Sequence, residues 1–176
     1  MVGSPEEARS GRVLAICVGP GGIPKPVVDA AKVGVLGLDR DAHRFEGHGG
    51  AHRAVCLFFT NDYATLRADG VDCEAPGTFG ENVLIEGLDP AGLRAQDRLQ
   101  IEDVLLEIHD IREPCGTLKR VDRRFPDLMV GRSGFVCRVI KTGVLRAGAP
   151  VTVIPFAPNT RGPFRSTALP TGLQSG

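Results

Sequence analysis

The sequence has no tryptophan, a single tyrosine and no excess of charge of either sign. Lys plus Arg and Asp plus Glu both total 21, so the formal net charge is zero. A neutral chain has no overall attraction for nucleic acid or for an anionic membrane surface, and any attraction for an anion has to come from a local cluster of cations. The composition therefore predicts no nucleic-acid partner.

Long apolar runs are also missing, since none approaches the roughly 20 residues that span a bilayer. The N-terminal stretch MVGSPEEARSGR lacks the basic and then apolar layout of a signal peptide. These absences predict no membrane association and a cytoplasmic location. The length of 176 residues suits one domain with one core, because chains of this size bury roughly 70% of their unfolded surface.

The cysteine pattern argues against two kinds of stabilising framework. The chain has five cysteines, an odd number, and they form no CxxC pair and no regular spacing. A disulfide network or a zinc site with four thiolate ligands would need a different pattern. The histidines at positions 43, 48 and 52 fit no standard zinc spacing, and an HExxH motif is absent. We therefore expect reduced thiols and no zinc.

Long helical patterns are rare, because 23 glycines and 13 prolines divide the chain into short apolar runs. Runs of this length that are rich in β-branched residues and flanked by turn residues are typical of strands. They predict a mainly β fold with roughly six to eight strands. The expected strands include residues 12–18, 54–60, 135–140 and 149–155, and a hairpin that joins 99–101 to 104–108.

Two helices are expected beside the strands. One begins at the N-capping residue Thr60 and ends at Gly70. The other is shorter and runs from Pro114 to Pro126. The expected organisation is an N-terminal extension at 1–11, one domain at 12–154, and a proline-rich tail at 155–176.

Four of the five cysteines have a structural explanation. Cys17, Cys56 and Cys137 each lie inside an apolar, strand-like run, where a cysteine behaves as a small buried hydrophobe. Cys73 lies between two acidic residues, whose charges oppose the formation of a thiolate. We therefore expect these four thiols to be poor nucleophiles.

Cys115 differs from the other four in its local surroundings. It follows Pro114 in the first turn of the second expected helix, where free backbone N–H groups favour an anion. Arg112, Lys119 and Arg120 add positive charge, and such conditions lower the pKa of a thiol and make it a nucleophile or a metal ligand. The alternative is a cysteine that is simply buried at a helix start.

Two glycine-rich stretches also stand out. The stretch GLDRDAHRFEGHGGAHRAV crowds glycines and histidines before an expected strand. It could present N–H groups and side-chain donors to an anionic ligand, or it could be a plain turn. The stretch APGTFGENVLIEG places Glu81 and Asn82 where an apolar run begins. Neither stretch alone specifies a function.

Taken in order along the chain, these stretches and the sequence REPCGTL resemble the MOSC domain, which is named for the C-terminal part of molybdenum cofactor sulfurases. The likeness covers roughly residues 12–154. Three motifs carry it: HGG followed by RAV, the GEN triplet, and an RxPC step at 112–115. Their residues include His48, Gly49, Gly50, Arg53, Gly80, Glu81, Asn82, Arg112 and Cys115.

The resemblance implies a partly open β-barrel of the MOSC type with a few short helices. It implies that Cys115 is catalytic and either carries a persulfide or ligates molybdenum, so that the molybdenum cofactor is the expected cofactor. Pyridoxal phosphate is a further family association, because larger members carry an aminotransferase-like cysteine desulfurase domain. The implied cofactor-binding residues are Arg112, His48, Gly49, Gly50, Arg53, Gly80, Glu81 and Asn82.

Three functions follow from the resemblance. The first is a sulfur carrier or sulfurtransferase, in which Cys115 accepts sulfur from a cysteine desulfurase or another donor and passes it to the molybdenum cofactor or another small acceptor. The second is a molybdenum-dependent reductase of N-hydroxylated compounds with Cys115 as the metal ligand and a reductase as partner. The third is a non-catalytic cofactor-binding module.

The sequence departs from the family pattern at two positions. His52 stands where many family members have an acidic or amide residue, and this change would alter the charge of the site or its choice of substrate. Glu113 places an acid within two residues of the thiol, which weakens the expected stabilisation of a thiolate.

Overall fold

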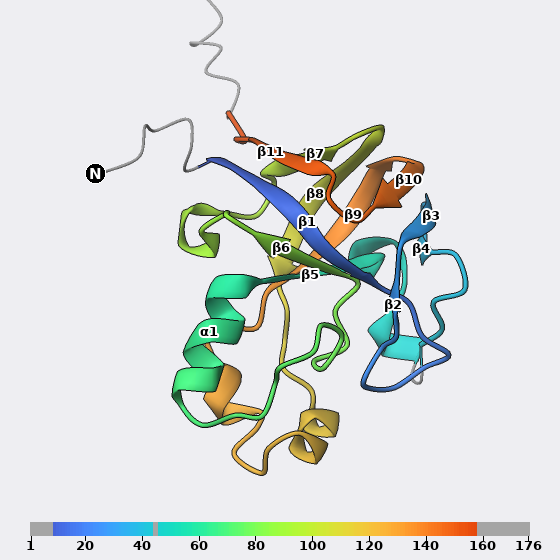
Figure 1. Ribbon diagram of the computed structural model, residues 1–176. Helices are drawn as coiled ribbons and strands as arrows, with labels where there is room; N and C mark the ends of the chain where they lie inside the picture. The colour runs from blue at the N-terminus through green and yellow to red at the C-terminus, as the bar shows by residue number, and fades with distance from the viewer. Residues whose placement is uncertain (1–8, 44–45, 158–176) are drawn as a thin grey trace, which may run out of the picture.

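Seven strands close into a ring in the computed structural model, which describes residues 9–43 and 46–157 (Figure 1). The order around the ring is β1-β11-β7-β8-β9-β5-β6. The pair β5 and β6 is parallel and the others are antiparallel. The mainly β barrel predicted from the sequence is confirmed. The strands of the ring are β1 (Ser10–Cys17), β5 (Val55–Phe59), β6 (Val83–Glu86), β7 (Arg98–Ile101), β8 (Val104–Ile111), β9 (Phe135–Lys141) and β11 (Pro150–Ile154).

A short pairing closes the ring between the first and last strands. It joins Ser10 to Thr152 and Arg12 to Pro150, while the rest of β1 turns to pair with β6. The predicted domain boundary at residue 12 therefore falls inside β1, because the strand already pairs at Ser10. Of the predicted N-terminal extension and C-terminal tail, residues 1–8 and 158–176 lie outside the described residues.

Four further strands lie beside the ring and were not predicted. The two-residue β2 (Val27–Val28) pairs with the end of β1. A second sheet has the order β10-β3-β4. These elements are short and interrupted by glycine and proline, so their sequences carry little of the alternation that identifies a strand. The strands of this sheet are β3 (Ala30–Gly34), β4 (Gly37–Leu38) and β10 (Gly143–Arg146).

The barrel interior is the main core, and it follows from alternation along the strands. In β11, Val151 and Val153 are buried while Thr152 between them is exposed. This period of two places one face of each strand in the core and the other in solvent. The inward-facing apolar side chains of all seven strands form one contact network. Burial of these side chains is the principal source of folding stability.

A second apolar cluster lies outside the barrel, beneath α1 (Thr60–Ala68), which packs on β5 and β6 (Figure 1). The helix buries Tyr63 and Leu66, one turn apart, as its predicted apolar stripe requires. Four rings stack edge to face or in parallel in this cluster, and this aromatic packing fixes the segments that lead to the site described below. The rings belong to Phe58, Tyr63, Phe79 and Phe125.

The prediction of a continuous helix from Pro114 to Pro126 is wrong. Cys115 has extended backbone angles (φ −97°, ψ 146°), and only a short 3-10 helix, Gly116–Arg120, follows it. A separate 3-10 turn at Asp127–Met129 lies further on. The apolar side chains that suggested a helix are buried all the same, because side chains of both 3-10 turns reach into the second cluster. Further 3-10 turns are Glu46–His48, Ala51–Arg53 and Pro90–Gly92.

The hairpin predicted at residues 102 and 103 is confirmed. Ile101 of β7 pairs with Val104 of β8, and Glu102 adopts the left-handed conformation that a tight turn requires (φ 50°).

Within the described residues, no helix is long and apolar enough to cross a membrane.

Candidate functional site

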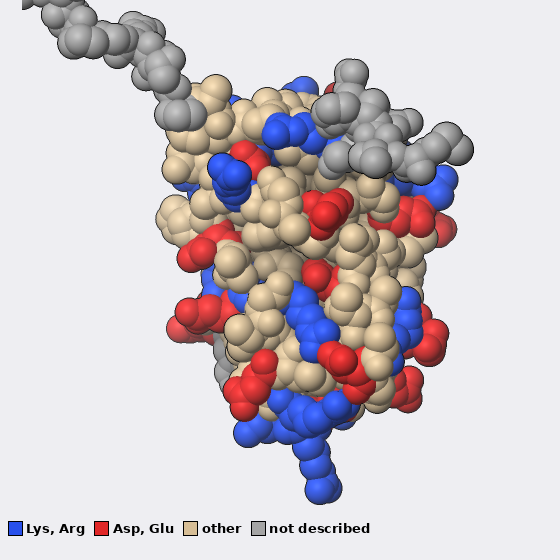
Figure 2. Space-filling view, turned by 90° about the vertical axis from the view of Figure 1, so that its left-hand side faces the viewer, with Lys and Arg blue, Asp and Glu red and all other residues tan. Residues whose placement is uncertain are grey.

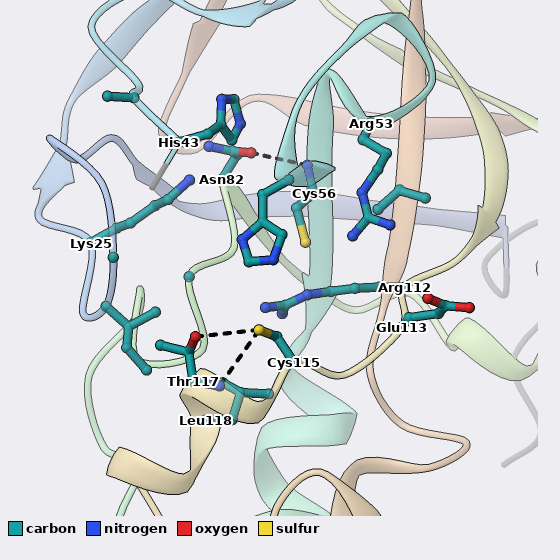
Figure 3. A pocket seen from close by; sticks show the side chains of 16 residues that line it. Lys25, His43, Arg53, Cys56, Asn82, Arg112, Glu113, Cys115, Thr117 and Leu118 are labelled. Carbon is teal, nitrogen blue, oxygen red and sulfur yellow. Dashed lines mark hydrogen bonds between the residues drawn. The ribbon is translucent and has the colours of Figure 1, made fainter. Parts of the chain in front are cut away.

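A pocket of about 90 Å³ lies among several loops at one end of the barrel. Three of these loops are residues 18–26 after β1, residues 46–54 before β5, and residues 112–118 after β8, and residues 42–43 and 80–82 add to the wall. Cys115 lies in its wall, together with side chains that are distant in the sequence (Figure 3). The structure therefore brings the HGG loop and the RxPC step to one place, as their shared role in the resemblance implied.

The Cys115 thiol is half-buried and held by two contacts from one residue. Its Sγ lies 3.3 Å from the Thr117 hydroxyl and accepts a hydrogen bond from the Thr117 N–H at 3.5 Å (Figure 3). This arrangement exists because Cys115 is the N-cap residue of the short 3-10 helix. N-cap side chains accept hydrogen bonds from the first free N–H groups of a helix.

Opposing effects act on the pKa of Cys115, and the net effect lowers it. Burial raises the pKa, but the two Thr117 hydrogen bonds and the positive charges of Arg112 and Arg53 outweigh burial. A lower pKa keeps more of the sulfur as thiolate at a given pH, and the thiolate is the nucleophile and the metal ligand. The predicted reactive character of Cys115 therefore has a physical basis, although Thr117 supplies much of it.

The lowered pKa of Cys115 should change the pH dependence of its alkylation. Because the thiolate persists below the ordinary thiol pKa, we expect the iodoacetamide reaction of Cys115 to reach its half-maximal rate at a lower pH than that of a free cysteine peptide. Thr117→Val removes the hydroxyl contact and should move that midpoint to higher pH. Mass spectrometry of the alkylated peptides measures the rate at each pH.

Thr65→Val is the matched control, because its hydroxyl bonds to a helix carbonyl far from the pocket. It should leave the midpoint of Cys115 alkylation unchanged. A midpoint of the wild-type protein at or above that of the free peptide would refute the thiolate assignment.

Two arginines face the thiol, and each has a buried N–H without a partner. Arg112 donates from Nη2 to the Phe79 carbonyl at 2.5 Å. Its Nη1 and the Nε of Arg53 are buried, and the described residues offer neither of them an acceptor. A buried donor without a partner costs about 1–3 kcal/mol. Both arginines line the pocket, so an acceptor on a bound molecule that reached these N–H groups would remove this cost.

Lys119 and Arg120 do not supply the positive charge predicted for the thiol. Both are exposed, and neither lines the pocket. They belong to the segment between β8 and β9, at the lower end of the molecule in Figure 1, and basic side chains gather at this end in Figure 2. The Arg112 and Arg53 guanidinium groups take the predicted role.

The GEN residues are divided between pocket and interior. Gly80 and Asn82 line the pocket. Glu81 is fully buried and turned away from it, since one carboxylate oxygen accepts from the Tyr63 hydroxyl at 2.6 Å and from the Gly77 N–H at 2.7 Å. Glu81 is therefore placed to support the second cluster and the loop of Gly77.

The Asn82 amide joins three segments around the pocket. Its oxygen accepts from the Cys56 N–H at 3.0 Å, and its nitrogen donates to Cys17 O at 3.3 Å and to Asp41 Oδ2 at 2.8 Å. Since its oxygen and its nitrogen are both engaged by the protein, we assign Asn82 a structural role in the wall of the pocket.

The HGG loop contributes His48 to the pocket lining. Burial lowers the pKa of His48, and the charges of Arg53, Arg112 and His43 lower it further. A neutral imidazole is therefore favoured there. Gly49 packs on the His43 ring, where a Cβ would lie 2.8 Å from Nδ1, so this glycine permits a close approach.

Gly50 and His52 lie beside the pocket lining. Gly50 has a positive φ of 101° and allows the turn into Ala51–Arg53. His52 is exposed and stacks on His109 with ring centroids 4.5 Å apart. The departure from the family pattern at His52 therefore lies outside the pocket lining.

Sequence reasoning missed several pocket residues, among them Lys25, Cys56 and Thr117. Cys56 was expected in the core, but it is half-buried and lines the pocket. Burial raises its pKa, although the charge of Arg112 opposes the rise. Thr117 lies two residues after Cys115, which is where the N–H that an N-cap side chain accepts is found, so the sequence did contain a sign of this contact.

Cys17 and Cys137 are buried, in line with their predicted structural roles. Cys73, which was expected in a polar loop, is buried as well. Burial raises the pKa of all three, to about 12 for Cys17. For Cys73, burial is a larger cause than the neighbouring acids that the sequence suggested.

A family model for the MOSC domain matches residues 44–152, which is more than half of the chain. The chain belongs to the MOSC domain family. The match covers the HGG, GEN and RxPC motifs, so the three motifs that line or support the pocket are MOSC motifs. Residues 18–26 and Asp41, which also build the pocket wall, precede the matched region.

Individual proteins are also similar to this chain. A protein of Gibberella moniliformis named "Reductase" is 31% identical over 72% of this chain and 24% of its own length. The protein YflK of Bacillus subtilis is 27% identical over 58% of this chain and 48% of its own. The chain thus spans about a quarter and about half of the lengths of these relatives. The crystal structure of YiiM from Geobacillus stearothermophilus has the same fold, with a TM-score of 0.70 and 24% identity over 82% of this chain and 75% of that one.

Proposed function

We propose that this MOSC domain holds the molybdenum cofactor with Cys115 as a ligand of the metal and acts in the reduction of a small N-hydroxylated compound. One observation carries the proposal. A half-buried thiol whose pKa is lowered lines a pocket together with two arginines, each of which has a buried N–H that finds no acceptor among residues 9–43 and 46–157. A thiolate suits a soft metal, and unpartnered cationic donors suit the anionic groups of the cofactor.

Each residue has a distinct part in this proposal. Cys115 would supply the thiolate, which Thr117 holds in place. Arg53 and Arg112 would donate to the oxygen atoms of the bound group through the N–H groups that have no acceptor in the described part of the chain. When bound, the cofactor supplies a metal that changes its oxidation state and so passes electrons to a substrate.

The name of one relative supports a reductase function for this chain. The relative from Gibberella moniliformis is named a reductase, and the chain matches about a quarter of it. By analogy, we propose that this chain receives its electrons from a separate reductase or from a further domain.

A second candidate function is sulfur transfer, and the contacts of Cys115 favour it. A persulfide on Cys115 needs a nucleophilic thiolate to form it, and the N–H and hydroxyl of Thr117 would stabilise that thiolate. In this case a cysteine desulfurase or another donor supplies the sulfur. The same arginines would then bind an anionic sulfur acceptor.

Metal analysis and intact mass distinguish the two candidates. The full chain is produced in a host that makes the molybdenum cofactor, and molybdenum is measured by mass spectrometry. The reductase proposal expects molybdenum in stoichiometric amount together with pterin fluorescence. Absence of molybdenum, with a mass increase of about 32 Da on Cys115 after incubation with a desulfurase and cysteine, would instead support sulfur transfer.

A further inference from the structure

One wall of the pocket comes from residues that precede the MOSC family match. Residues 18–26 join β1 to β2, and Gly22, Ile23 and Lys25 of this loop line the pocket. Figure 3 shows Lys25 entering the pocket from the side opposite Arg53 and Arg112. The pocket thus has cationic side chains on two facing walls.

A buried ion pair fixes the position of the Lys25 ammonium group. The side chain is 8% exposed, and its Nζ lies 2.7 Å from Asp41 Oδ2. Asp41 is 2% exposed and also accepts from the Gly19 N–H at 3.0 Å and from the Asn82 amide at 2.8 Å. With three donors around it, the Asp41 carboxylate holds the ammonium in one place.

The backbone of the loop is fixed as well. The Lys25 N–H donates to Gly77 O at 2.9 Å, and Val18 N donates to Pro26 O at 3.0 Å. Lys25 therefore reaches the pocket from a rigid support. A long lysine side chain loses much rotamer freedom when it is buried, and here the ion pair and the packing of the loop offset that loss.

The ammonium keeps donor capacity that the protein does not use. A lysine has three N–H donors, and across residues 9–43 and 46–157 a single hydrogen bond from Nζ is seen, to Asp41. The Lys25–Asp41 pair is neutral as a unit, and the charges of Arg53 and Arg112 balance those of the Cys115 thiolate and of Glu113, which also lines the pocket. The pocket therefore offers an oxyanion the unused N–H groups of Lys25 beside two guanidinium groups, and charge-assisted donors of this kind favour its binding.

We propose that Lys25 is a third ligand-binding residue of the pocket, that Asp41 is its positioning residue, and that together with the arginines it binds an oxyanion of the phosphate or sulfate type on the bound molecule. This inference goes beyond the proposed function. It applies whether Cys115 ligates a metal or carries sulfur, and its test needs neither activity.

The test is a titration of the full chain with inorganic phosphate and with sulfate by isothermal calorimetry. Removing Lys25 alone would leave the buried Asp41 charge unpaired and could unfold the protein. The variant is therefore the double substitution Lys25→Met with Asp41→Asn, which keeps the pair neutral and keeps one side-chain oxygen that accepts from the Gly19 N–H, while the contact with the Asn82 amide is lost. Circular dichroism checks that it folds.

The wild-type protein should bind phosphate with a dissociation constant below about 10 mM, and the double variant should bind it about tenfold more weakly. The control Lys141→Met removes an exposed lysine of β9 and changes the net charge of the molecule, yet it should leave the affinity within about twofold.

Equal affinity of the wild-type protein and the folded double variant would overturn the inference, and so would a wild-type protein that binds neither anion. The molybdenum content of the double variant distinguishes the source of the oxyanion. Loss of both phosphate binding and molybdenum would assign Lys25 to the phosphate of the cofactor. Loss of phosphate binding with molybdenum retained would assign it to an anionic group of the substrate.

Discussion

Replacement of Cys115 with serine is expected to lower the activity of the protein by at least about a thousandfold. A serine hydroxyl stays protonated at neutral pH, so it neither ligates a soft metal nor attacks a sulfur donor as a thiolate does. Cys115 is half-buried at the start of a short 3-10 helix, and serine is a good N-cap residue. The free energy of unfolding should therefore change by less than about 1 kcal/mol.

The measurement is the molybdenum content and the reductase rate with an N-hydroxylated substrate, or the mass increase on Cys115 if sulfur transfer is the function. Cys137→Ser is the matched control, because Cys137 is fully buried in the barrel. A hydroxyl buried there without a partner costs about 1–3 kcal/mol, so this variant should be less stable but should keep its activity per folded molecule. Equal loss of activity in both variants would remove the distinction between a reacting and a structural cysteine.

Gly77→Ala is expected to destabilise the fold by about 3 kcal/mol or more. Gly77 has a φ of 84°, and a Cβ at this position would lie 2.0 Å from Lys25 O. The left-handed conformation alone costs a residue other than glycine about 1–2 kcal/mol. The added methyl would also push away the loop that carries Lys25, and it would disturb the N–H of residue 77 that Glu81 accepts at 2.7 Å.

Urea denaturation followed by circular dichroism measures this effect. Gly92→Ala is the control, since a Cβ at Gly92 meets nothing within 4 Å, and its stability should change by no more than about 0.5 kcal/mol. If the two variants unfold at the same urea concentration, the contact between Gly77 and the Lys25 loop does not constrain the pocket as described.

The strands of this fold were easier to predict from the sequence than its turns. The strands around Val151, Leu106 and Val139 follow a period of two, because every second residue enters the barrel, and this pattern is visible in the sequence. The continuous helix expected after Pro114 does not form. Apolar residues do recur at helical spacing there. Two 3-10 turns bury these side chains in the second cluster just as well, so a continuous helix is not needed.

The motif residues of the site were predicted better than their individual roles. Cys115, Arg112 and Arg53 meet at the pocket, whereas Glu81 supports the aromatic cluster instead. Lys25 was not predicted, because a lysine among prolines and glycines has no pattern that marks it as part of a site. Only its contacts with Asp41 and Gly77 assign it to the pocket.

The sequence by itself determined the β-barrel class, the MOSC motifs and which of the five cysteines differs from the others. These features depend on local alternation and on short motifs, which can be read along the chain. Tertiary structure decided which charges surround the Cys115 thiol. Lys119 and Arg120 are near in sequence but exposed, while Arg53 and Lys25 reach the pocket from distant loops. Coulomb interactions depend on distance in space and on burial, and the packing of the loops sets both quantities.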